Sequence, residues 1–423
     1  MDRMVITGFL LMAAMMFMLL RTKVRPALVF SVLPLIAGVV LGFSPSALLR
    51  YITGGMETVL PVAAMFGCAI LFFGLLESAG MFAWLTGILK ARMKYSACSV
   101  MLFTVLISII AHLSGSGAVS YLIVANACRD VYAKNNIPAV KLMCLCSLTF
   151  GIMNMTPWGG PCGRLAAVLR VSPAEIWSYC IPVQLAGLGM VFLIAVFMSK
   201  GTEEVKAEEK AEEVQRAERP PRLVLNVILL AAVLVLLVCV SIQPFIIFGI
   251  GAIILMLINF KGIEHLRQTA GKCMKQAWPM MITVTATGVL TGVFTQSPLL
   301  DSMTEFFGEL LPRNIADHAH ILLGALSNPI SWFVIGEVQI FGLVPIVSEL
   351  VRGAGIPAAA TGAAFLIPYS AAVFVLQTTV SVHLGISVCG VTMREHVRET
   401  YKWTLLCSLG MLAFAVITGI LPF

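Results

Sequence analysis

The sequence predicts an all-α protein that crosses a membrane many times and is built from two related halves. Hydrophobic residues make up 59% of the 423 residues and charged residues only 12%, a composition that excludes an ordinary soluble domain. Apolar runs long enough to cross a bilayer as helices recur along the whole chain. Short stretches of the first half also recur in the second half, at a nearly constant separation along the chain.

The internal repeat is the strongest functional signal. Gly54 and Pro61 recur as Gly271 and Pro279. Two further pairs are Leu113-Ser114-Gly115-Ser116-Gly117 with Leu326-Ser327-Asn328-Pro329, and Ile137-Pro138-Ala139 with Ile356-Pro357-Ala358. A repeat whose second copy enters the membrane from the opposite side is typical of secondary transporters, which bind substrate where the copies meet. Transport is therefore the leading hypothesis.

Each half is predicted to hold five spans and one re-entrant helical hairpin. The first half covers residues 1–199, a charged linker 200–222, and the second half 223–423. The hairpins are expected near 97–133 and 315–351, and the acidic segment around Asp301, Glu305 and Glu309 as an interfacial helix. The spans are expected near 4–20, 27–43, 58–76, 139–170, 177–198, 223–241, 244–260, 277–297, 359–392 and 402–421.

The distribution of basic residues predicts the orientation. Of the 28 Lys and Arg residues, 22 fall in the linker and in loops on one face, which the positive-inside rule assigns to the cytoplasm. Five spans per half then place both termini outside a cytoplasmic (inner) membrane, with the first hairpin on the cytoplasmic side and the second facing outside. The same bias explains the net charge of +7 without a nucleic-acid partner.

Four polar interruptions fall at membrane depth, where a broken helix is tolerated only inside protein or beside a water-filled cavity. Two are the predicted hairpin tips, at 114–117 and 327–329, and two break the following spans, at 154–161 and 377–381. Backbone N–H groups at half-helix starts suit carboxylate oxygens, and freed carbonyls suit a coupling cation. The candidate substrate-binding residues are Ser114, Gly115, Ser116, Gly117, Asn154, Thr156, Gly159, Gly160, Arg164, Ser327, Asn328, Thr378 and Thr379.

Two charged residues stand out near these breaks. Arg164 lies at a depth where an unpaired guanidinium is expensive, so it should reach a surface or pair with Glu337 or a substrate carboxylate. Glu337 is the candidate carrier of a coupling proton or ligand of a coupling cation, and a purely structural ion pair is the alternative. The hydroxyls of Ser114 and Ser327 are the candidate ligands of a sodium ion at the tips.

Three short stretches carry a resemblance to a known family. They are Met153-Asn154 with Trp158-Gly159-Gly160-Pro161 and Arg164, then Phe341-Gly342-Leu343-Val344-Pro345, and Glu395-His396 with Lys402-Trp403. With them the chain resembles the citrate–metal:proton symporter family (CitMHS) of the ion-transporter superfamily. The resemblance implies a dimeric, two-hairpin fold that works as an elevator. It also implies a di- or tricarboxylate substrate taken up with protons, often as a metal complex.

The sequence therefore predicts a cation-coupled symporter of a small organic anion, with citrate or a related carboxylate first. Another organic anion, such as a sugar acid or a C4-dicarboxylate, is the nearest alternative, and a channel is a second. A membrane-embedded enzyme would need a nucleophile beside a base, or a metal cluster. His112 and Glu337 are the nearest candidates and lie in different halves. We expect no enzyme activity and no resident metal or cofactor. The coupling ion, proton or sodium, and a divalent metal carried with the substrate stay open.

Overall fold

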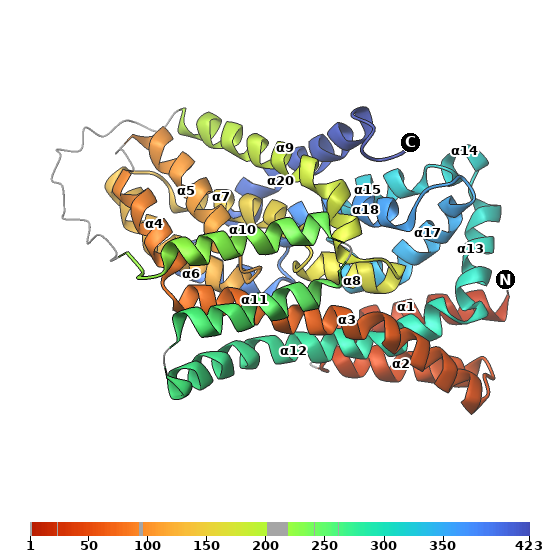
Figure 1. The fold of residues 1–423 in the computed structure, drawn as a ribbon. Helices are drawn as coiled ribbons and strands as arrows, with labels where there is room; N and C mark the ends of the chain where they lie inside the picture. The colour runs from red at the N-terminus through yellow and green to blue at the C-terminus, as the bar shows by residue number, and fades with distance from the viewer. Residues whose placement is uncertain (1, 23, 93–95, 201–218, 241, 261) are drawn as a thin grey trace.

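The structure is a computed structural model that describes residues 2–22, 24–92, 96–200, 219–240, 242–260 and 262–423. Within these ranges the chain forms helices, turns and short connections, and no strand (Figure 1). The predicted charged linker falls mainly on residues 201–218, outside the described residues.

The described part of the first half forms the helices α1 to α9. They are α1 (Arg3–Arg21), α2 (Pro26–Val40), α3 (Pro45–Ser78), α4 (Met81–Arg92), α5 (Ala97–His112), α6 (Gly117–Lys134), α7 (Ala139–Met153), α8 (Gly160–Leu169) and α9 (Pro173–Ser199).

The second half repeats the same order of elements. They are α10 (Leu223–Cys239), α11 (Pro244–Asn259), α12 (Ile263–Thr295), α13 (Pro298–Leu310), α14 (Arg313–Ala316), α15 (Ala319–Ile330), α16 (Gly336–Val338), the π-helical turn η1 (Gln339–Leu343), α17 (Val344–Arg352), α18 (Ala358–Val373), α19 (Val380–Cys389) and α20 (Met393–Ile417). In both halves a long third helix precedes a short helix, a helical hairpin, a broken helix and a last long helix.

Local sequence explains several helix starts. Ser44, Ser172 and Ser297 each accept a hydrogen bond from the first turn of the following helix, and a proline fills the next position. Both features favour a helix start. At α20, Thr392 and Glu395 form a reciprocal capping box. In this exposed first turn, before the apolar part of the helix, hydrogen bonds from the Thr392 hydroxyl and backbone N–H hold the pKa of Glu395 below its usual range.

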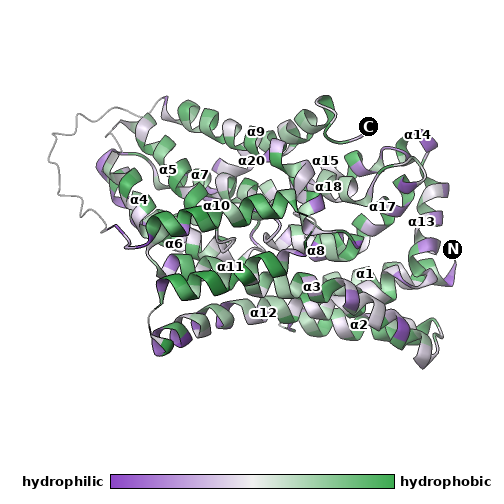
Figure 2. Cartoon of the chain, in the orientation of Figure 1, coloured by the Kyte–Doolittle hydropathy of each residue, from purple (hydrophilic) through white to green (hydrophobic). Residues whose placement is uncertain are grey.

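The surface pattern is that of a multi-pass membrane protein. Among the described residues, five helices are long and apolar enough to cross a bilayer by length and composition: α1, α3, α9, α12 and α20. Figure 2 shows hydrophobic residues along α9, α10 and α11 and hydrophilic residues gathered toward the two ends of the helix bundle. Both termini lie at one end, while α9 ends and α10 begins at the other (Figure 1).

Some elements extend beyond the sequence prediction. The helices α3 and α12 begin several turns before the predicted span starts at 58 and 277, and α4 is an additional helix. Their extra turns carry polar side chains such as Arg50, Glu57 and Lys272. A prediction from hydropathy identifies the apolar stretches that cross the membrane. It misses the polar helical turns that continue beyond those stretches. The acidic segment forms the helix α13, as predicted.

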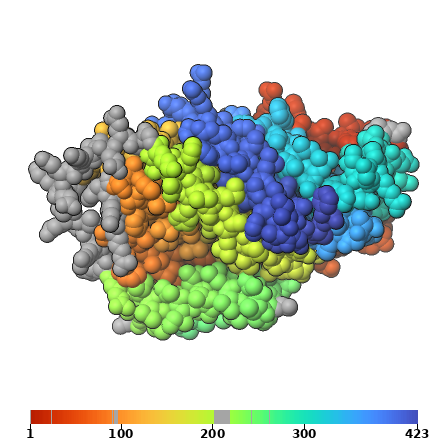
Figure 3. Space-filling view, turned by 90° about the horizontal axis from the view of Figure 1, so that it is seen from above, coloured from red at the N-terminus to blue at the C-terminus, as the bar shows by residue number. Residues whose placement is uncertain are grey.

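Contacts between the halves come in reciprocal pairs. The helix α2 packs on α12 and its counterpart α11 packs on α3, while α7 packs on α20 and α18 on α9. The helices α1–α3 and α10–α12 are hereafter called the first layer. The hairpins, the broken helices, α9 and α20 form the second layer, and Figure 3 shows α9 and α20 side by side on its outer face. This exchange of partners is what a structural duplication predicts.

The crossing of α3 and α12 shows the same reciprocity at single residues. A Cβ on Gly55 would collide with the backbone of Gly288 and Gly292, and a Cβ on Gly74 would collide with Cys273. When the halves are aligned in one register, Gly55 corresponds to Cys273 and Gly74 to Gly292. Small residues let helix backbones approach closely in a bilayer, where packing rather than hydrophobic burial holds helices together.

Replacing Gly55 with leucine should therefore separate α3 from α12. Overpacking of this kind costs about 3 kcal/mol or more because the obstacle is backbone. We expect a large fall in the yield of monodisperse protein on size-exclusion chromatography and in its melting temperature. Gly189→Leu is the matched control, since Gly189 lies in the membrane helix α9 and a Cβ there would meet no atom within 4 Å. Equal behaviour of the two variants would contradict the prediction.

Candidate functional site

Four connections interrupt the helices of the second layer. The hairpin tips are residues 113–116, between α5 and α6, and residues 331–335, between α15 and α16. The helix breaks are residues 154–159, between α7 and α8, and residues 374–379, between α18 and α19. Contacts between these segments and the helices that follow them bring all four together in one region of the molecule.

The first tip is a tight turn. Gly115 has a φ of +70°, a conformation that glycine adopts at little cost. The Ser114 hydroxyl accepts a hydrogen bond from the Ser116 backbone N–H at 3.3 Å and donates to the Ala111 carbonyl at 3.4 Å. These bonds shape the turn, so the Ser114 hydroxyl already has protein partners.

The residue before this tip has a structural role. The imidazole of His112 shares a 2.9 Å hydrogen bond with the Ser120 hydroxyl and stacks on the ring of Phe150. Its side chain is buried. This arrangement agrees with a packing histidine.

The first break is joined to the first tip by Trp158. Its indole N–H donates to the Leu113 carbonyl at 2.8 Å, and a Cβ on Gly115 would lie 3.2 Å from the indole. The indole also packs on Phe73 of α3 and Phe248 of α11, with ring centroids 5.2 and 5.4 Å apart. Trp158 therefore links the break, the tip and the first layer. Asn154 and Thr156 are buried in this break.

The second tip lies later in the chain than the sequence predicts. Ser327 and Asn328 belong to the last turns of α15. The Ser327 hydroxyl donates to the Gly324 carbonyl at 2.7 Å, and the Asn328 amide donates to the Ser408 hydroxyl of α20 at 2.7 Å. The Ser327 hydroxyl and the Asn328 amide nitrogen thus have partners within the fold, and both residues keep a helical backbone. Placing them at the tip was wrong.

The alignment of the two tips changes accordingly. Gly117 and Gly336 both start the second helix of their hairpin and are therefore equivalent positions. In this register Ser114 corresponds to Phe333, whose side chain is 80% exposed, and Ser327 has no counterpart at the first tip. The first tip is therefore polar, whereas the second tip is apolar apart from Ser331.

A buried glutamine that the sequence analysis missed supports the second tip. The amide of Gln339 donates to the Ser331 hydroxyl at 3.0 Å and to the Val334 carbonyl at 2.9 Å. Gln339 is fully buried and opens the π-helical turn, a rare element that is frequent at functional sites. The sequence signal for this residue was a single glutamine, Gln339, with apolar residues on both sides.

The second break begins at residue 374, slightly before the predicted one, and Ser381 lies within α19. The Thr379 hydroxyl donates to the Val373 carbonyl at 2.6 Å, and Thr378 is exposed. A Cβ on Gly117 would collide with the side chains of Phe374 and Ser381. The start of α6 therefore lies against this break.

Arg164 and Glu337 form an ion pair between α8 and the second hairpin. A guanidinium nitrogen lies 2.6 Å from a carboxylate oxygen, and the side chains are 22% and 32% exposed. Arg164 also donates from Nε to the Gly160 carbonyl at 2.9 Å. Beside the pair, a Cβ on Gly336 would collide with the Tyr369 hydroxyl. Glu337 is one of the two partners that the sequence predicts for Arg164.

The helical segments 117–134, 160–169, 336–352 and 380–389 all begin at these tips and breaks. Across the described residues, none of these four starts has a hydrogen bond from a capping side chain. A helix start carries about half a positive charge and unsatisfied N–H groups. Together with Arg164 they make the region suited to an anion. The residues at or beside these starts include Ser116, Gly117, Gly159, Gly160, Glu337 and Thr379.

The comparison with known proteins decides the family. The sequence profile described as "Citrate transporter" matches residues 3–376. The chain belongs to the citrate transporter family. It is thus a membrane transporter, and the predicted family resemblance and the prediction that it is not an enzyme are confirmed.

Individual relatives cover nearly the whole transporter. Two proteins of Bacillus subtilis (strain 168) are similar to it, "Citrate transporter" at 25% identity and "Mg(2+)/citrate complex secondary transporter" at 26%. The matches cover 99% and 98% of both chains, respectively. The crystal structure of the Alcanivorax borkumensis YdaH transporter has a similar fold, with a TM-score of 0.64 at 14% identity over 94% of this chain and 98% of that chain.

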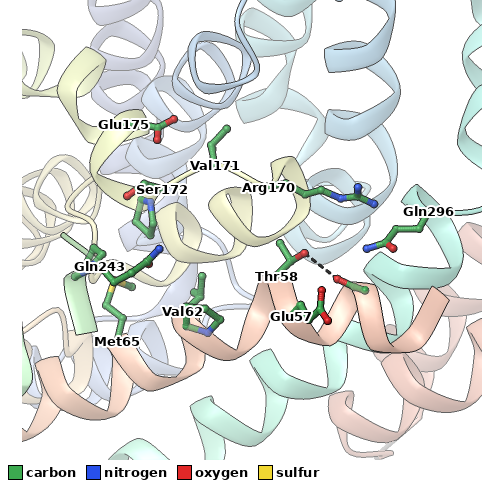
Figure 4. Close-up of a pocket in the computed structure, with 14 residues that line it drawn as sticks. Glu57, Thr58, Val62, Met65, Arg170, Val171, Ser172, Glu175, Gln243 and Gln296 are labelled. Carbon is green, nitrogen blue, oxygen red and sulfur yellow. Dashed lines mark hydrogen bonds between the residues drawn. The ribbon is translucent and has the colours of Figure 1, made fainter. Parts of the chain in front are cut away.

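A large cavity of the transporter lies outside the predicted site. It has a volume of about 530 Å³ and is bordered by α3, the α8–α9 connection, the start of α11 and the end of α12 (Figure 4). A second cavity of about 340 Å³ lies between α8, α12, α13, α17 and α18. Arg170 lines both cavities, and the sequence analysis did not single it out. The first is hereafter called the α3 cavity.

Arg170 has an unusual backbone. It ends α8 with a φ of 57°, in the left-handed region, which costs a residue other than glycine about 1–2 kcal/mol. Its counterpart in the second half is Gly390, which ends α19 with a φ of 71°. The first half therefore keeps an arginine where the second half has the glycine that this conformation favours.

Proposed function

We propose that this transporter moves citrate, or a closely related di- or tricarboxylate, by cation-coupled secondary transport. The observation that carries the proposal is the presence of four uncapped helix starts at the tips and breaks, two of which, those of α8 and α16, lie beside Arg164. Such a region suits several carboxylate groups, because backbone N–H groups and one planar guanidinium bind their oxygens. The names of the two Bacillus subtilis relatives support citrate as the substrate.

The tips and breaks supply the other contacts of the proposed site. Two of the helical segments begin at Gly117 and Gly160, and their first backbone N–H groups are proposed donors to the substrate. The breaks add the polar side chains of Asn154, Thr156 and Thr378. Ser114 and Thr379 shape their connections through hydrogen bonds to backbone. Ser327 and Asn328 hold α15 in place from within the helix.

Glu337 couples a proton to substrate binding in this proposal. In the ion pair, Glu337 occupies the guanidinium that a substrate carboxylate needs. Protonation removes the negative charge of Glu337 and frees Arg164 for the substrate. A proton and a carboxylate therefore bind together, which is the requirement for symport. Coupling by a sodium ion at the tips is the alternative. Clusters of three or more His, Cys, Asp or Glu side chains that could hold a metal are absent from the described part of the chain.

Alternating access completes the proposal. The reciprocal contacts support two inverted repeats, with the first layer as a scaffold and the second layer as the part that moves like an elevator. The first hairpin would screen the site from the cytoplasm and the second from the outside. Both termini would then lie outside a cytoplasmic membrane, and the family resemblance adds a homodimer. Each opening exposes the anion to one side only.

The test is uptake of labelled citrate into proteoliposomes, with the pH gradient, sodium and magnesium varied independently. We expect accumulation above the external concentration when the pH gradient is imposed. Accumulation that needs sodium instead would move the coupling site from Glu337 to the tips. Equilibration without accumulation would indicate a channel, and no uptake of citrate, C4-dicarboxylates or sugar acids would overturn the proposed function.

A further inference from the structure

The hydroxyl of Tyr369 lies beside the ion pair of Arg164 and Glu337 but takes no part in it. Tyr369 belongs to α18, and its ring stacks on Phe365 of the same helix with the centroids 5.0 Å apart. Its hydroxyl lies over the backbone of Gly336, where a Cβ would collide with it. The charges of Glu337 and Arg164 both act on this hydroxyl. Tyr369 does not line the α3 cavity, and it presents its polar group to the place where the proposed function puts the substrate.

The Tyr369 hydroxyl makes no hydrogen bond to the described part of the chain. The side chain as a whole is only 6% exposed, yet the hydroxyl oxygen is not sealed from solvent. A polar group inside a protein normally has a hydrogen-bond partner, and burying one without a partner costs free energy. The hydroxyl is therefore free to bind a ligand.

The internal repeat shows that packing at this position does not need a hydroxyl. Gly117 and Gly336 are equivalent positions, and in the same register Tyr369 corresponds to Phe150 of α7. The Phe150 ring packs on Tyr121 near the first tip, with the centroids 4.9 Å apart. An aromatic ring thus fills both positions, and only the second half adds an oxygen atom. Because an unpaired hydroxyl inside the protein is costly, its presence in the second half indicates a function.

We infer that the Tyr369 hydroxyl binds a hydroxyl group of the substrate and so selects hydroxylated carboxylates over analogues without that group. This inference rests on the proposed function, in which Arg164 holds a substrate carboxylate. A phenol both donates and accepts a hydrogen bond, as a substrate hydroxyl does, whereas a guanidinium only donates. A neutral hydroxyl also suits the neighbourhood of Glu337, where a further carboxylate would meet a second acid.

The experiment compares uptake of citrate with uptake of tricarballylate, which is citrate without its hydroxyl. Both are measured in proteoliposomes that contain the unaltered protein or Tyr369→Phe. We expect the unaltered protein to have a KM for citrate at least about tenfold lower than its KM for tricarballylate. Tyr369→Phe should raise the KM for citrate about tenfold and leave the KM for tricarballylate unchanged, with the same kcat for each substrate.

A matched control separates specificity from stability. Tyr132→Phe removes a buried hydroxyl that donates to the Thr104 hydroxyl at 3.0 Å. This variant should have a lower melting temperature and the same preference for citrate over tricarballylate as the unaltered protein. Tyr369→Phe should show the reverse, an unchanged melting temperature and a lost preference, because its hydroxyl has no hydrogen bond to lose among the described residues.

The outcomes distinguish this inference from the proposed function. Equal KM values for the two substrates in the unaltered protein would overturn the role of Tyr369 and leave the proposed function intact. An unchanged KM for citrate in Tyr369→Phe, or equal changes for both substrates, would do the same. If the unaltered transporter moves neither citrate nor another di- or tricarboxylate, the proposed function and the inference are both overturned.

Discussion

Replacing Arg164 with alanine should reduce citrate uptake by about 100-fold, since losing charge-assisted hydrogen bonds to a carboxylate costs close to 3 kcal/mol. The substitution removes the guanidinium that lies beside the uncapped starts of α8 and α16. The measurement is the initial rate of uptake at citrate concentrations below KM, normalised to the amount of protein in the liposomes. Arg164→Lys keeps the charge and loses the planar fork, so it should fall between alanine and the unaltered protein.

The same substitution also leaves Glu337 without its ion-pair partner. A double variant separates this effect from the loss of substrate binding. If the ion pair is purely structural, Arg164→Ala leaves an unpaired carboxylate, and Glu337→Ala should largely rescue it. If Arg164 binds substrate, the Arg164→Ala, Glu337→Ala variant should transport no better than Arg164→Ala alone. Recovery of uptake in the double variant, with equal protein amounts, would contradict the role of Arg164.

Much of the architecture could be predicted because lipid imposes a strict rule on the backbone. A polar or glycine-rich interruption of an apolar run is stable only inside protein or beside water, so residues 154–159 could be recognised as a break from sequence. The partner of Arg164 could also be predicted from sequence. Glu337 is the isolated acid near the second tip, and an unpaired charge inside a membrane is costly.

The second tip could not be placed correctly from sequence. Asn328 looks like a tip residue until its partner is known, and that partner, Ser408, lies 80 residues away on α20. A tertiary hydrogen bond thus decides whether a polar residue ends a helix or stays within it. Gly336, which starts the next helix where Gly117 starts its counterpart, gives the correct register of the repeat.

Arg170 was missed for a related reason. Its importance comes from a left-handed backbone and from two cavities that it lines, and neither property is local to the sequence. An alignment of the two halves through this region would have placed Arg170 opposite Gly390. A repeat that exchanges glycine for arginine at a helix end is a signal that can be read without a structure.

Replacing Glu337 with glutamine should separate transport from its driving force. Glutamine has nearly the shape of a protonated glutamate and carries no charge, so Arg164 stays free for substrate whatever the pH. We expect citrate exchange to continue, the KM to become the same at low and high pH, and accumulation driven by a pH gradient to fall to the level of simple equilibration. The measurement is the ratio of internal to external labelled citrate, with and without the gradient.

Glu349→Gln is the matched control for Glu337→Gln, because Glu349 lies on the same hairpin and pairs with Arg352 at the surface. Its accumulation ratio should equal that of the unaltered protein. If Glu337→Gln still accumulates citrate against a pH gradient, the proton is carried elsewhere and the ion pair with Arg164 is structural. If exchange is lost together with accumulation, Glu337 is needed for the site itself, since a neutral side chain of the same shape cannot replace it. Retained exchange without accumulation is the one outcome that only a coupling role explains, because a structural ion pair has no reason to respond to the gradient.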